Sequence, residues 1–236
     1  MKKIAFTLAE TLIVIGIIGV VAALTLPNLN HATGDKETVT RVKKIYAALT
    51  DAADRAQVIY GPADGWFKNE ANSNRVAYAE IFGRRLSEFM KVSKNCGMNG
   101  EGCFSHSPLL SIDGSKYPEG TNDYFENLSD YTYMVLLADG TSIGFNGDSK
   151  IRVDIDGPNK GKNQIGKDNF TFDFSHWNKN EEFAEITPDC EYYSKANDED
   201  LGGPWNYETI WVIKFGNLDY LKCPDELDFV ENHSCK

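Results

Sequence analysis

Glu10 is the residue with the clearest chemistry, because it is the single charge in a long apolar run. The run extends from Phe6 to Leu26 and reads FTLAETLIVIGIIGVVAALTL. Leaving one carboxylate unpaired in hydrocarbon costs roughly 2.5–3.5 kcal/mol on membrane-insertion scales. A chain that keeps a carboxylate there is expected to supply a partner for it.

The apolar run also has the length of a membrane helix. At 1.5 Å per residue, residues 6–26 rise about 32 Å, which matches a bilayer core. Lys2 and Lys3 precede the run, so the positive-inside rule places the N-terminus in the cytoplasm and the remaining chain outside. Two alternatives need no filament. They are a plain signal anchor and a secretory signal cleaved after residue 23.

Small residues form a stripe along this predicted helix. Gly16, Gly19 and Ala23 follow the spacing of one helical face and would let another helix approach closely. Pro27 removes a backbone donor, so the helix is expected to kink or loosen there.

A loop at residues 154–168, DIDGPNKGKNQIGKD, holds the second concentration of chemistry. Asp154, Asp156, Asn159 and Asp168 offer oxygen atoms to a hard cation such as Ca²⁺. The loop is not an EF-hand, because Ile165 stands where the closing Glu would be. The alternative is an ordinary turn held by hydrogen bonds from side chains to the backbone.

The five cysteines predict disulfides in an exported chain. Cys96 and Cys103 bracket a short Gly-rich loop that a disulfide could close. Cys223 and Cys235 bracket a segment near the C-terminus, and pairing of Cys190 with Cys223 is an open alternative. The chain has no CxxC motif and its four histidines are scattered, which argues against zinc.

The composition argues against enzymes and against partners of negative charge. The chain has 236 residues and a net charge of −11, which disfavours nucleic acid. No nucleophile-elbow, zinc-protease or phosphate-loop motif occurs, so no catalytic residues and no required cofactor are predicted. A cluster of aromatic residues would serve either the core or adhesion to a sugar or surface: Tyr192, Tyr193, Trp205, Tyr207 and Trp211.

Periodicity predicts two helices followed by a small sheet. Apolar residues recur at three and four over residues 38–60, within an amphipathic helix at about 35–60 that has Asp35 as N-cap and Gly61 as its end. A second helix is expected over residues 75–94. Four antiparallel strands are expected over residues 131–138, 141–145, 150–156 and 169–174, with a hairpin turn at Asp139-Gly140.

The N-terminal sequence MKKIA followed by FTLAE resembles that of type IV pilins and of the pseudopilins of type II secretion systems. The resemblance implies cleavage between Ala5 and Phe6 by a prepilin peptidase that also methylates the new N-terminus. In the filament, the Phe6 amine of one subunit would pair with Glu10 of its neighbour. Ala5 departs from the usual Gly before the cut, so cleavage is expected to be slower.

The resemblance also implies a fold and a domain plan. The expected fold class is α+β and pilin-like, a long N-terminal helical spine packed on an antiparallel four-stranded sheet. The plan is a leader at residues 1–5, a transmembrane and assembly helix at 6–29, and an extracytoplasmic globular domain at 30–236. Pilins commonly pin a C-terminal loop with a disulfide. This favours the pairs Cys96–Cys103 and Cys223–Cys235 and leaves Cys190 over.

The function expected from the resemblance is that of a structural filament subunit rather than an enzyme. Its partners would be identical or related pilin subunits, the peptidase, an inner-membrane assembly platform and, before assembly, membrane lipid. Its location would be the bacterial inner membrane, single-pass with the N-terminus in the cytoplasm, and then a periplasmic or cell-surface filament. Two alternatives remain, a secretion pseudopilin and an anchored binding protein that never polymerises. Some pseudopilins carry calcium in a comparable loop.

Overall fold

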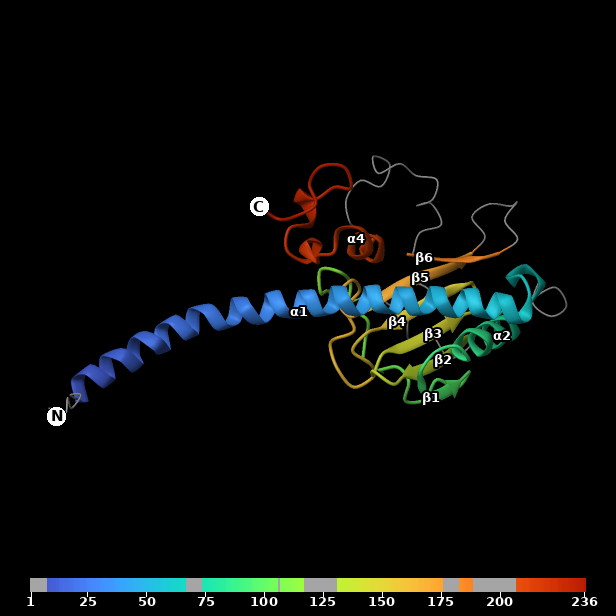
Figure 1. Ribbon diagram of the computed structural model, residues 1–236, viewed down its shortest axis with the longest axis horizontal. Coiled ribbons are helices and arrows are strands. Elements are labelled where there is room, and N and C mark those ends of the chain that lie inside the picture. The colour runs from blue at the N-terminus through green and yellow to red at the C-terminus, as the bar shows by residue number, and fades with distance from the viewer. Residues whose placement is uncertain (1–7, 67–73, 106, 117–130, 176–182, 189–206) are drawn as a thin grey trace, which may run out of the picture. The chain divides into compact units, whose positions relative to one another are not determined.

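The computed structural model describes residues 8–66, 74–105, 107–116, 131–175, 183–188 and 207–236 (Figure 1). The chain divides into two units, Met1–Glu37 and Thr38–Lys236. Helix α1 (Leu8–Tyr60, 53 residues) contributes to both units. Fold and core are described for the second unit, and the helical part of the first unit is described by itself.

Helix α1 continues through Pro27, where a kink or loosening was predicted, and through Asp35, the predicted N-cap. Asp35 therefore lies inside the helix rather than at its start. A proline removes one hydrogen bond, and here the turns on both sides continue. The predicted end is confirmed, because α1 stops at Tyr60 and Gly61 takes φ +79°, a conformation that suits glycine.

The second unit is built on a six-stranded antiparallel sheet (Figure 1). Its strands follow chain order, each pairing with the next: β1 (Val92–Gly97), β2 (Thr132–Leu137), β3 (Ser142–Asn146), β4 (Lys150–Asp154), β5 (Asn169–Ser175) and β6 (Glu185–Pro188). The Asp139-Gly140 turn joins β2 and β3, and Gly140 has φ +90°. The four predicted strands correspond to β2–β5.

The predicted fold class is therefore wrong in two respects. The sheet has six strands rather than four, because β1 and β6 extend it at both edges. The predicted spine also does not act as one element on this sheet, since the unit that contains the sheet begins at Thr38. The coarser class, α+β with an antiparallel sheet, is what the structure shows.

The core lies between α1 and one face of the sheet. Val42, Leu49 and Ala56 of α1 are fully buried, as the three-and-four spacing predicted. They belong to one apolar cluster with inward side chains of the sheet, among them Val135, Ile143, Phe145, Ile151, Val153, Phe170 and Phe172. Burial of these side chains from both elements is what holds the helix to the sheet.

Helix α2 (Arg75–Ser87) is shorter than predicted. The Asn74 side chain caps it by accepting hydrogen bonds from the amides of Val76 and Ala77. Gly83 permits close packing on β2, since an added Cβ would lie 2.3 Å from Tyr133 Cδ1. The predicted helix to residue 94 is wrong at its end, where residues 92–94 belong to β1.

The C-terminal part adds short helices along the β5–β6 side of the sheet. Helix α4 (Glu208–Phe215) buries Ile210, Trp211 and Val212 and contacts β5 and β6. Three short 3₁₀ turns complete the fold, η1 (Ala63–Gly65), η2 (Asp219–Leu221) and η3 (Pro224–Glu226). Figure 1 shows α4 and the C-terminus on one side of α1, with α2 and β1 on the other.

Candidate functional sites

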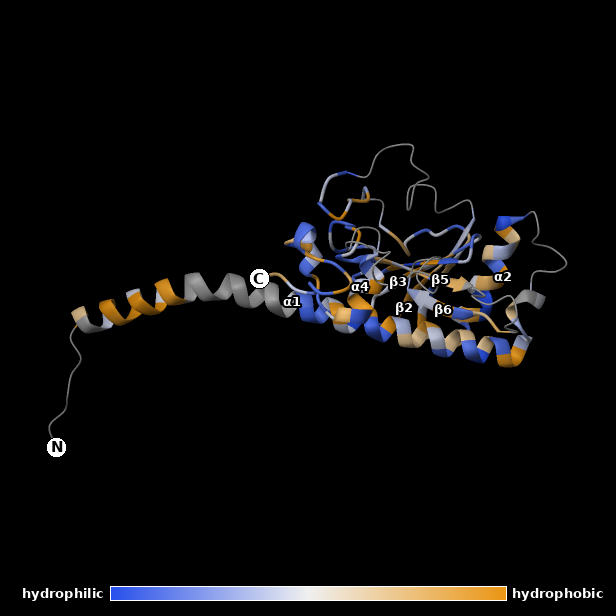
Figure 2. Cartoon of the chain, turned by 90° about the horizontal axis from the view of Figure 1, so that it is seen from above, coloured by the Kyte–Doolittle hydropathy of each residue, from blue (hydrophilic) through white to orange (hydrophobic). Residues whose placement is uncertain are grey.

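The first part of α1 exposes apolar side chains on every side. Nine large apolar residues between positions 8 and 21 have exposed fractions of 53% to 81%: Leu8, Leu12, Ile13, Val14, Ile15, Ile17, Ile18, Val20 and Val21. Consecutive helical residues point in different directions, so these nine apolar side chains are spread around the helix. Figure 2 shows the described residues of this run as mainly hydrophobic. Fully burying one such side chain gains about 1.5–3 kcal/mol. A surface of this kind calls for a covering partner.

The structure describes the surroundings of some predicted assembly residues and not of others. Gly16 and Gly19 lie in α1 with open space around them, since an added Cβ would meet no atom within 4 Å. Glu10, Ala23 and Pro27 lie within the bounds of α1, but their side chains are outside the described part. Ala5 and Phe6, the predicted cleavage site, also lie outside the described residues.

The structure overturns the predicted location in the membrane. Among the helices that the structure describes, none combines the length and the apolarity that crossing a bilayer requires. The prediction of a single-pass inner-membrane protein is therefore wrong.

Of the four predicted ligands in the acidic loop between β4 and β5, Asp156 and Asp168 approach one point, beside Gly161. Asp154 ends β4 with an exposed fraction of 1%, and Asp168, just before β5, has 6%. Asp156 and Asp168 both approach Gly161, where an added Cβ would lie 2.6 Å from Asp156 Oδ2 and 2.8 Å from Asp168 Oδ2. Asn159 is exposed. Only a glycine at position 161 leaves the space beside these two carboxylates open. We call the acidic side chains of this loop the carboxylate cradle.

Hydrogen bonds from neighbouring amide groups account for part of this arrangement of carboxylates. Asp154 Oδ1 accepts hydrogen bonds from the amides of Asp156 (3.2 Å) and Gly157 (2.9 Å). Asp168 Oδ1 accepts from the amide of Gln164 (2.5 Å) and from Asn169 Nδ2 (2.6 Å). These contacts are the side-chain-to-backbone bonds of the ordinary-turn alternative.

Two oxygen atoms of the cradle are left without a partner. Asp154 Oδ2 and Asp156 Oδ1 are buried and accept no hydrogen bond. Burial, followed by the neighbouring carboxyl groups of Asp156 and Asp168, raises the pKa of Asp154 to about 8. Burial also raises the pKa of Asp168. Two ionised carboxylates cannot hydrogen-bond to each other. Asp154 and Asp156 therefore need either a shared proton or a cation between them.

The structure tests part of the prediction that this loop binds a metal ion. Within the described ranges, no three His, Cys, Asp or Glu side chains are arranged to hold one metal ion together. The cradle therefore offers at most two carboxylates at one point, and other ligands would have to be main-chain or amide oxygens.

Two disulfides join Cys96 to Cys103 and Cys223 to Cys235, the pairs that the resemblance favoured. Cys190 lies outside the described residues. The first bridge lies on the face of the sheet opposite α1, where Cys103 packs with Phe104 and Met134 in a separate small cluster.

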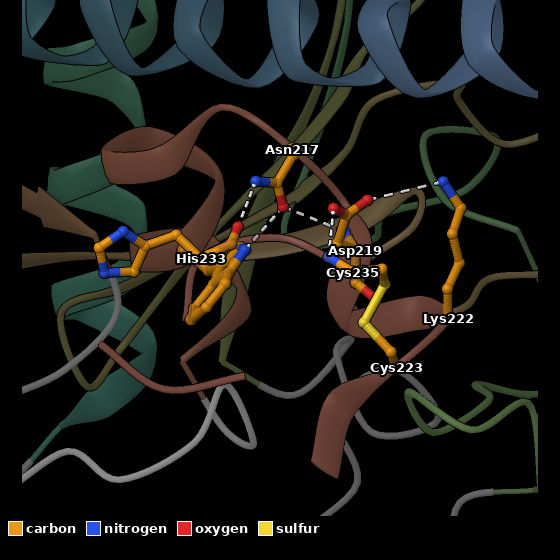
Figure 3. A network of polar contacts seen from close by, with 7 residues as sticks. Asn217, Asp219, Lys222, Cys223, His233 and Cys235 are labelled. Atoms are coloured by element: carbon orange, nitrogen blue, oxygen red, sulfur yellow. Dashed lines mark hydrogen bonds and ion pairs between the residues drawn. A yellow bond between two sulfur atoms is a disulfide. The ribbon is translucent and has the colours of Figure 1, made fainter. Parts of the chain in front are cut away.

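The second bridge belongs to a polar network that fixes the C-terminal segment (Figure 3). Asn217 donates from Nδ2 to the carbonyl of His233 and accepts a hydrogen bond from Trp211 Nε1. Asp219 accepts from the amide of Cys235 through Oδ2 and forms an ion pair with Lys222 through Oδ1. The loop from residue 223 to residue 235 is thus held at both ends.

The aromatic cluster does not form a described surface patch. Trp211 is fully buried, and Tyr207 packs edge-on against Phe229, with ring centroids 6.2 Å apart. Tyr192, Tyr193 and Trp205 lie outside the described residues. Where the cluster is described, it serves the core.

One surface site escaped the sequence reasoning. A pocket of about 510 Å³ lies beside the second part of α1, with Arg41, Lys44, Asp51 and Arg55 among its lining residues. The three-and-four spacing of these charges places them on one side of the helix. The pattern was visible in the sequence, but the other wall of the pocket comes from distant segments.

Comparison with protein-family models, with curated proteins and with solved structures finds no match for this chain.

Proposed function

We propose that this chain is the structural subunit of a type IV pilus-like filament, assembled through the first part of α1. The observation that carries the proposal is the apolar surface at residues 8–21, which covers all sides of the helix. Packing of several such helices side by side would bury this surface, and Gly16 and Gly19 would let them approach closely. The FTLAE motif supports the same reading.

Glu10 has a defined role in this proposal. Inside a bundle of apolar helices a carboxylate without a partner is strongly destabilising. After cleavage between Ala5 and Phe6, the amine of Phe6 on a neighbouring subunit would offer the opposite charge. Apolar packing drives assembly, and this ion pair sets the register between neighbours. Partners are further copies or related subunits and a prepilin peptidase, which removes the leader and methylates Phe6.

Replacement of Glu10 tests the proposal. The full chain with Glu10→Leu should still lose its five-residue leader, as intact-mass analysis would show, but filaments seen by electron microscopy should become scarce or absent. Glu101→Leu is the matched control, since it removes an exposed carboxylate from the second unit. Normal fibres containing the Glu10→Leu subunit would rule out the ion pair as the register device. A cut near Ala23 would point instead to a secreted protein.

The same motif occurs in secretion pseudopilins, and a shorter fibre would indicate that branch of the family. The non-polymerising alternative predicts that Glu10→Leu behaves like wild type in every assay. Filament length and the effect of Glu10→Leu therefore separate the three readings.

Calcium binding by the loop at residues 154–168 is a second proposal. It is favoured by the two buried oxygens that accept no hydrogen bond, Asp154 Oδ2 and Asp156 Oδ1. Asp156 and Asp168 would supply carboxylate oxygens, and a bound cation would take the place of the shared proton. The ion would join the two ends of the loop, next to β4 and β5.

Thermal unfolding of the full chain tests this second proposal. Calcium at 100 times its dissociation constant should stabilise the folded state by about 2.7 kcal/mol relative to chelator. Asp156→Asn should remove that response, whereas Asp225→Asn, at an exposed acid elsewhere, should keep it. An identical melting temperature in millimolar calcium and in chelator would favour the ordinary turn.

A further inference from the structure

The pocket beside α1 combines an apolar floor with a cationic rim. Its volume is about 510 Å³, within the range of ligand and peptide sites. The floor consists of Ile45, Ala48, Phe89, Met90 and Leu137. Because α1, the segment after α2 and the β2–β3 turn all contribute, the pocket is a feature of the second unit alone.

The charge of the pocket is opposite to that of the chain. Its lining has four cationic side chains, Arg41, Lys44, Arg55 and Lys91, and two acidic ones, Asp51 and Asp139. Both acids are already in ion pairs, Asp139 with Lys44 at 2.7 Å and Asp51 with Arg55 at 3.4 Å. Cationic side chains thus outnumber acidic ones by two in the lining, on a chain whose net charge is −11. An apolar partner with carboxylates would match it.

The C-terminal loop of this chain has that chemistry. Between Cys223 and Cys235 the sequence PDELDFVENHS contains four acidic residues and no lysine or arginine. Val230 is 48% exposed at the middle of the loop, with Glu231 exposed beside it and Asp225 and Glu226 exposed near its start. The loop thus presents one apolar side chain with carboxylates on both sides.

The loop is also held rigidly, which lowers the entropic cost of docking. Its disulfide closes the ends, and Leu227 and Phe229 are buried beneath it. Asp228 Oδ1 accepts hydrogen bonds from the amides of Val230 (2.8 Å) and Glu231 (2.6 Å). Val230 therefore stands at a tight turn whose backbone is already fixed.

Loop and pocket of one chain lie at opposite edges of the sheet. The pocket includes Lys91 and Leu137, next to β1 and at the end of β2. The loop follows α4, which packs beside β5 and β6. Figure 1 shows β1 and the C-terminal segment on different sides of α1. A contact between this loop and this pocket would therefore join two copies of the chain.

We infer that the C-terminal loop of one copy docks into the α1 pocket of the next. Val230 enters the apolar floor, and the loop carboxylates face the cationic rim. The contact joins two different surfaces of the same chain, so it repeats head to tail and produces a ring or an open array rather than a closed dimer. This deepens the proposed function and rests on it for the choice of a second copy as the occupant.

Zero-length cross-linking between isotope-labelled copies tests the contact. Equal amounts of ¹⁴N and ¹⁵N full chain are mixed in detergent, which covers residues 8–21, and treated with a carbodiimide that joins amines to carboxylates. Mass spectrometry should find Lys91 or Lys44 of one copy joined to Asp225, Glu226 or Glu231 of the other. Absence of these mixed-isotope products would overturn the inference, as would cross-links confined to single-isotope species.

Charge reversal gives an independent measure. Lys91→Glu or Glu231→Lys alone should lower the mixed-isotope yield roughly fivefold to tenfold, because a charge facing the partner becomes repulsive. A chain carrying both changes should recover the yield, since the pair is complementary again. The controls Lys116→Glu and Glu101→Lys, at exposed positions outside the pocket lining and the loop, should leave it unchanged. Failure of the double variant to recover would overturn the pairing.

The outcomes separate this contact from the filament proposal. Filaments that lack the cross-link would refute the contact and leave the filament role intact. The cross-link in a chain that never forms filaments would refute the filament role and leave the contact intact. A small anionic amphiphile that is retained in the pocket, seen by native mass spectrometry, and that excludes the loop would also overturn the inference.

Discussion

Residues 8–21 and residues 38–60 belong to the same helix but differ in which of their sides are apolar. In the first stretch large apolar residues point in every direction and are more than half exposed. In the second, apolar residues follow a single stripe, and Val42, Leu49 and Ala53 on that stripe are buried. The second stretch has its partner within the chain, namely the sheet.

This difference shows that the distribution of apolar residues around a helix indicates what kind of surface covers it. A single apolar stripe needs one covering surface, and folding of the same chain supplies it. A helix that is apolar all round cannot be covered by one sheet, so several neighbours must surround it. In the proposed function the first stretch serves assembly, whereas the second stretch contributes to the stability of the folded unit.

Charges placed in the first stretch should break assembly completely. Ile13→Asp with Ile17→Asp puts two carboxylates on one side of the helix, and neither would have a partner inside a bundle. We expect electron microscopy to show no filaments, while the unfolding midpoint of the second unit stays within error of wild type. Filaments that survive both charges would remove residues 8–21 from the assembly surface.

Truncation in the second stretch should reverse this pattern. Leu49 is fully buried, so Leu49→Ala should lower the free energy of unfolding by about 2–5 kcal/mol. Ile17→Ala, at a residue that is 60% exposed, should change it by less than about 0.5 kcal/mol. Denaturant titration of both variants measures the contrast. Equal losses would mean that the two stretches do not differ as described.

Gln57 attaches the second stretch to the last strand region. Its side chain donates to the Ala184 carbonyl (2.8 Å) and accepts from the Ala184 amide (2.7 Å). Gln57→Ala would leave both buried backbone groups unsatisfied, at a cost of about 1–3 kcal/mol. Hydrogen exchange at Ala184 should rise with the loss of stability, whereas Ile59→Ala, at a 64% exposed neighbour, should leave exchange unchanged.

The smallest effect is expected at the exposed ion pair of Lys44 and Asp139. Burial raises the pKa of Asp139, but hydrogen bonds from Lys44 and Thr141 outweigh it and hold the pKa below its ordinary value of 3.8. Stability from this pair is present above pH 3.8 and is lost as the pH falls through the lowered pKa. Lys44→Met should therefore cost about 0.2–1 kcal/mol at pH 7, and its difference from wild type should vanish in strong acid.

Strong periodic patterns could be read from the sequence, and weak ones could not. The stripe at Val42, Ile45 and Leu49 and the alternation of Phe170, Phe172 and Phe174 each repeat with the period of their element. Strand β1 gave no such signal, because the three residues at its centre are polar and exposed, and β6 is only four residues long. Both are edge strands, so pairing with a neighbour rather than side-chain alternation defines them.

Some features of the candidate sites could likewise be predicted from the sequence, and others depend on the tertiary structure. Composition alone indicated the acidic loop and the cysteines, because carboxylates and thiols are rare enough in such spacing to be noticed. Pairing of Asp156 with Asp168 across Gly161 depends on the path of the loop, which no local pattern encodes. The same holds for the pocket, where Arg41 and Lys91 meet through the packing of distant segments.

By itself, the sequence determined that this chain begins with an apolar helix bearing one carboxylate, and that an amphipathic helix and paired strands follow. These properties depend on residues close together in the chain, whose periodicity fixes the local conformation. Tertiary structure decided that the sheet has six strands, that the unit containing it begins at Thr38, and which charges surround the pocket. Such features arise only when segments far apart in the chain are buried against one another, and that choice minimises the free energy of the whole unit.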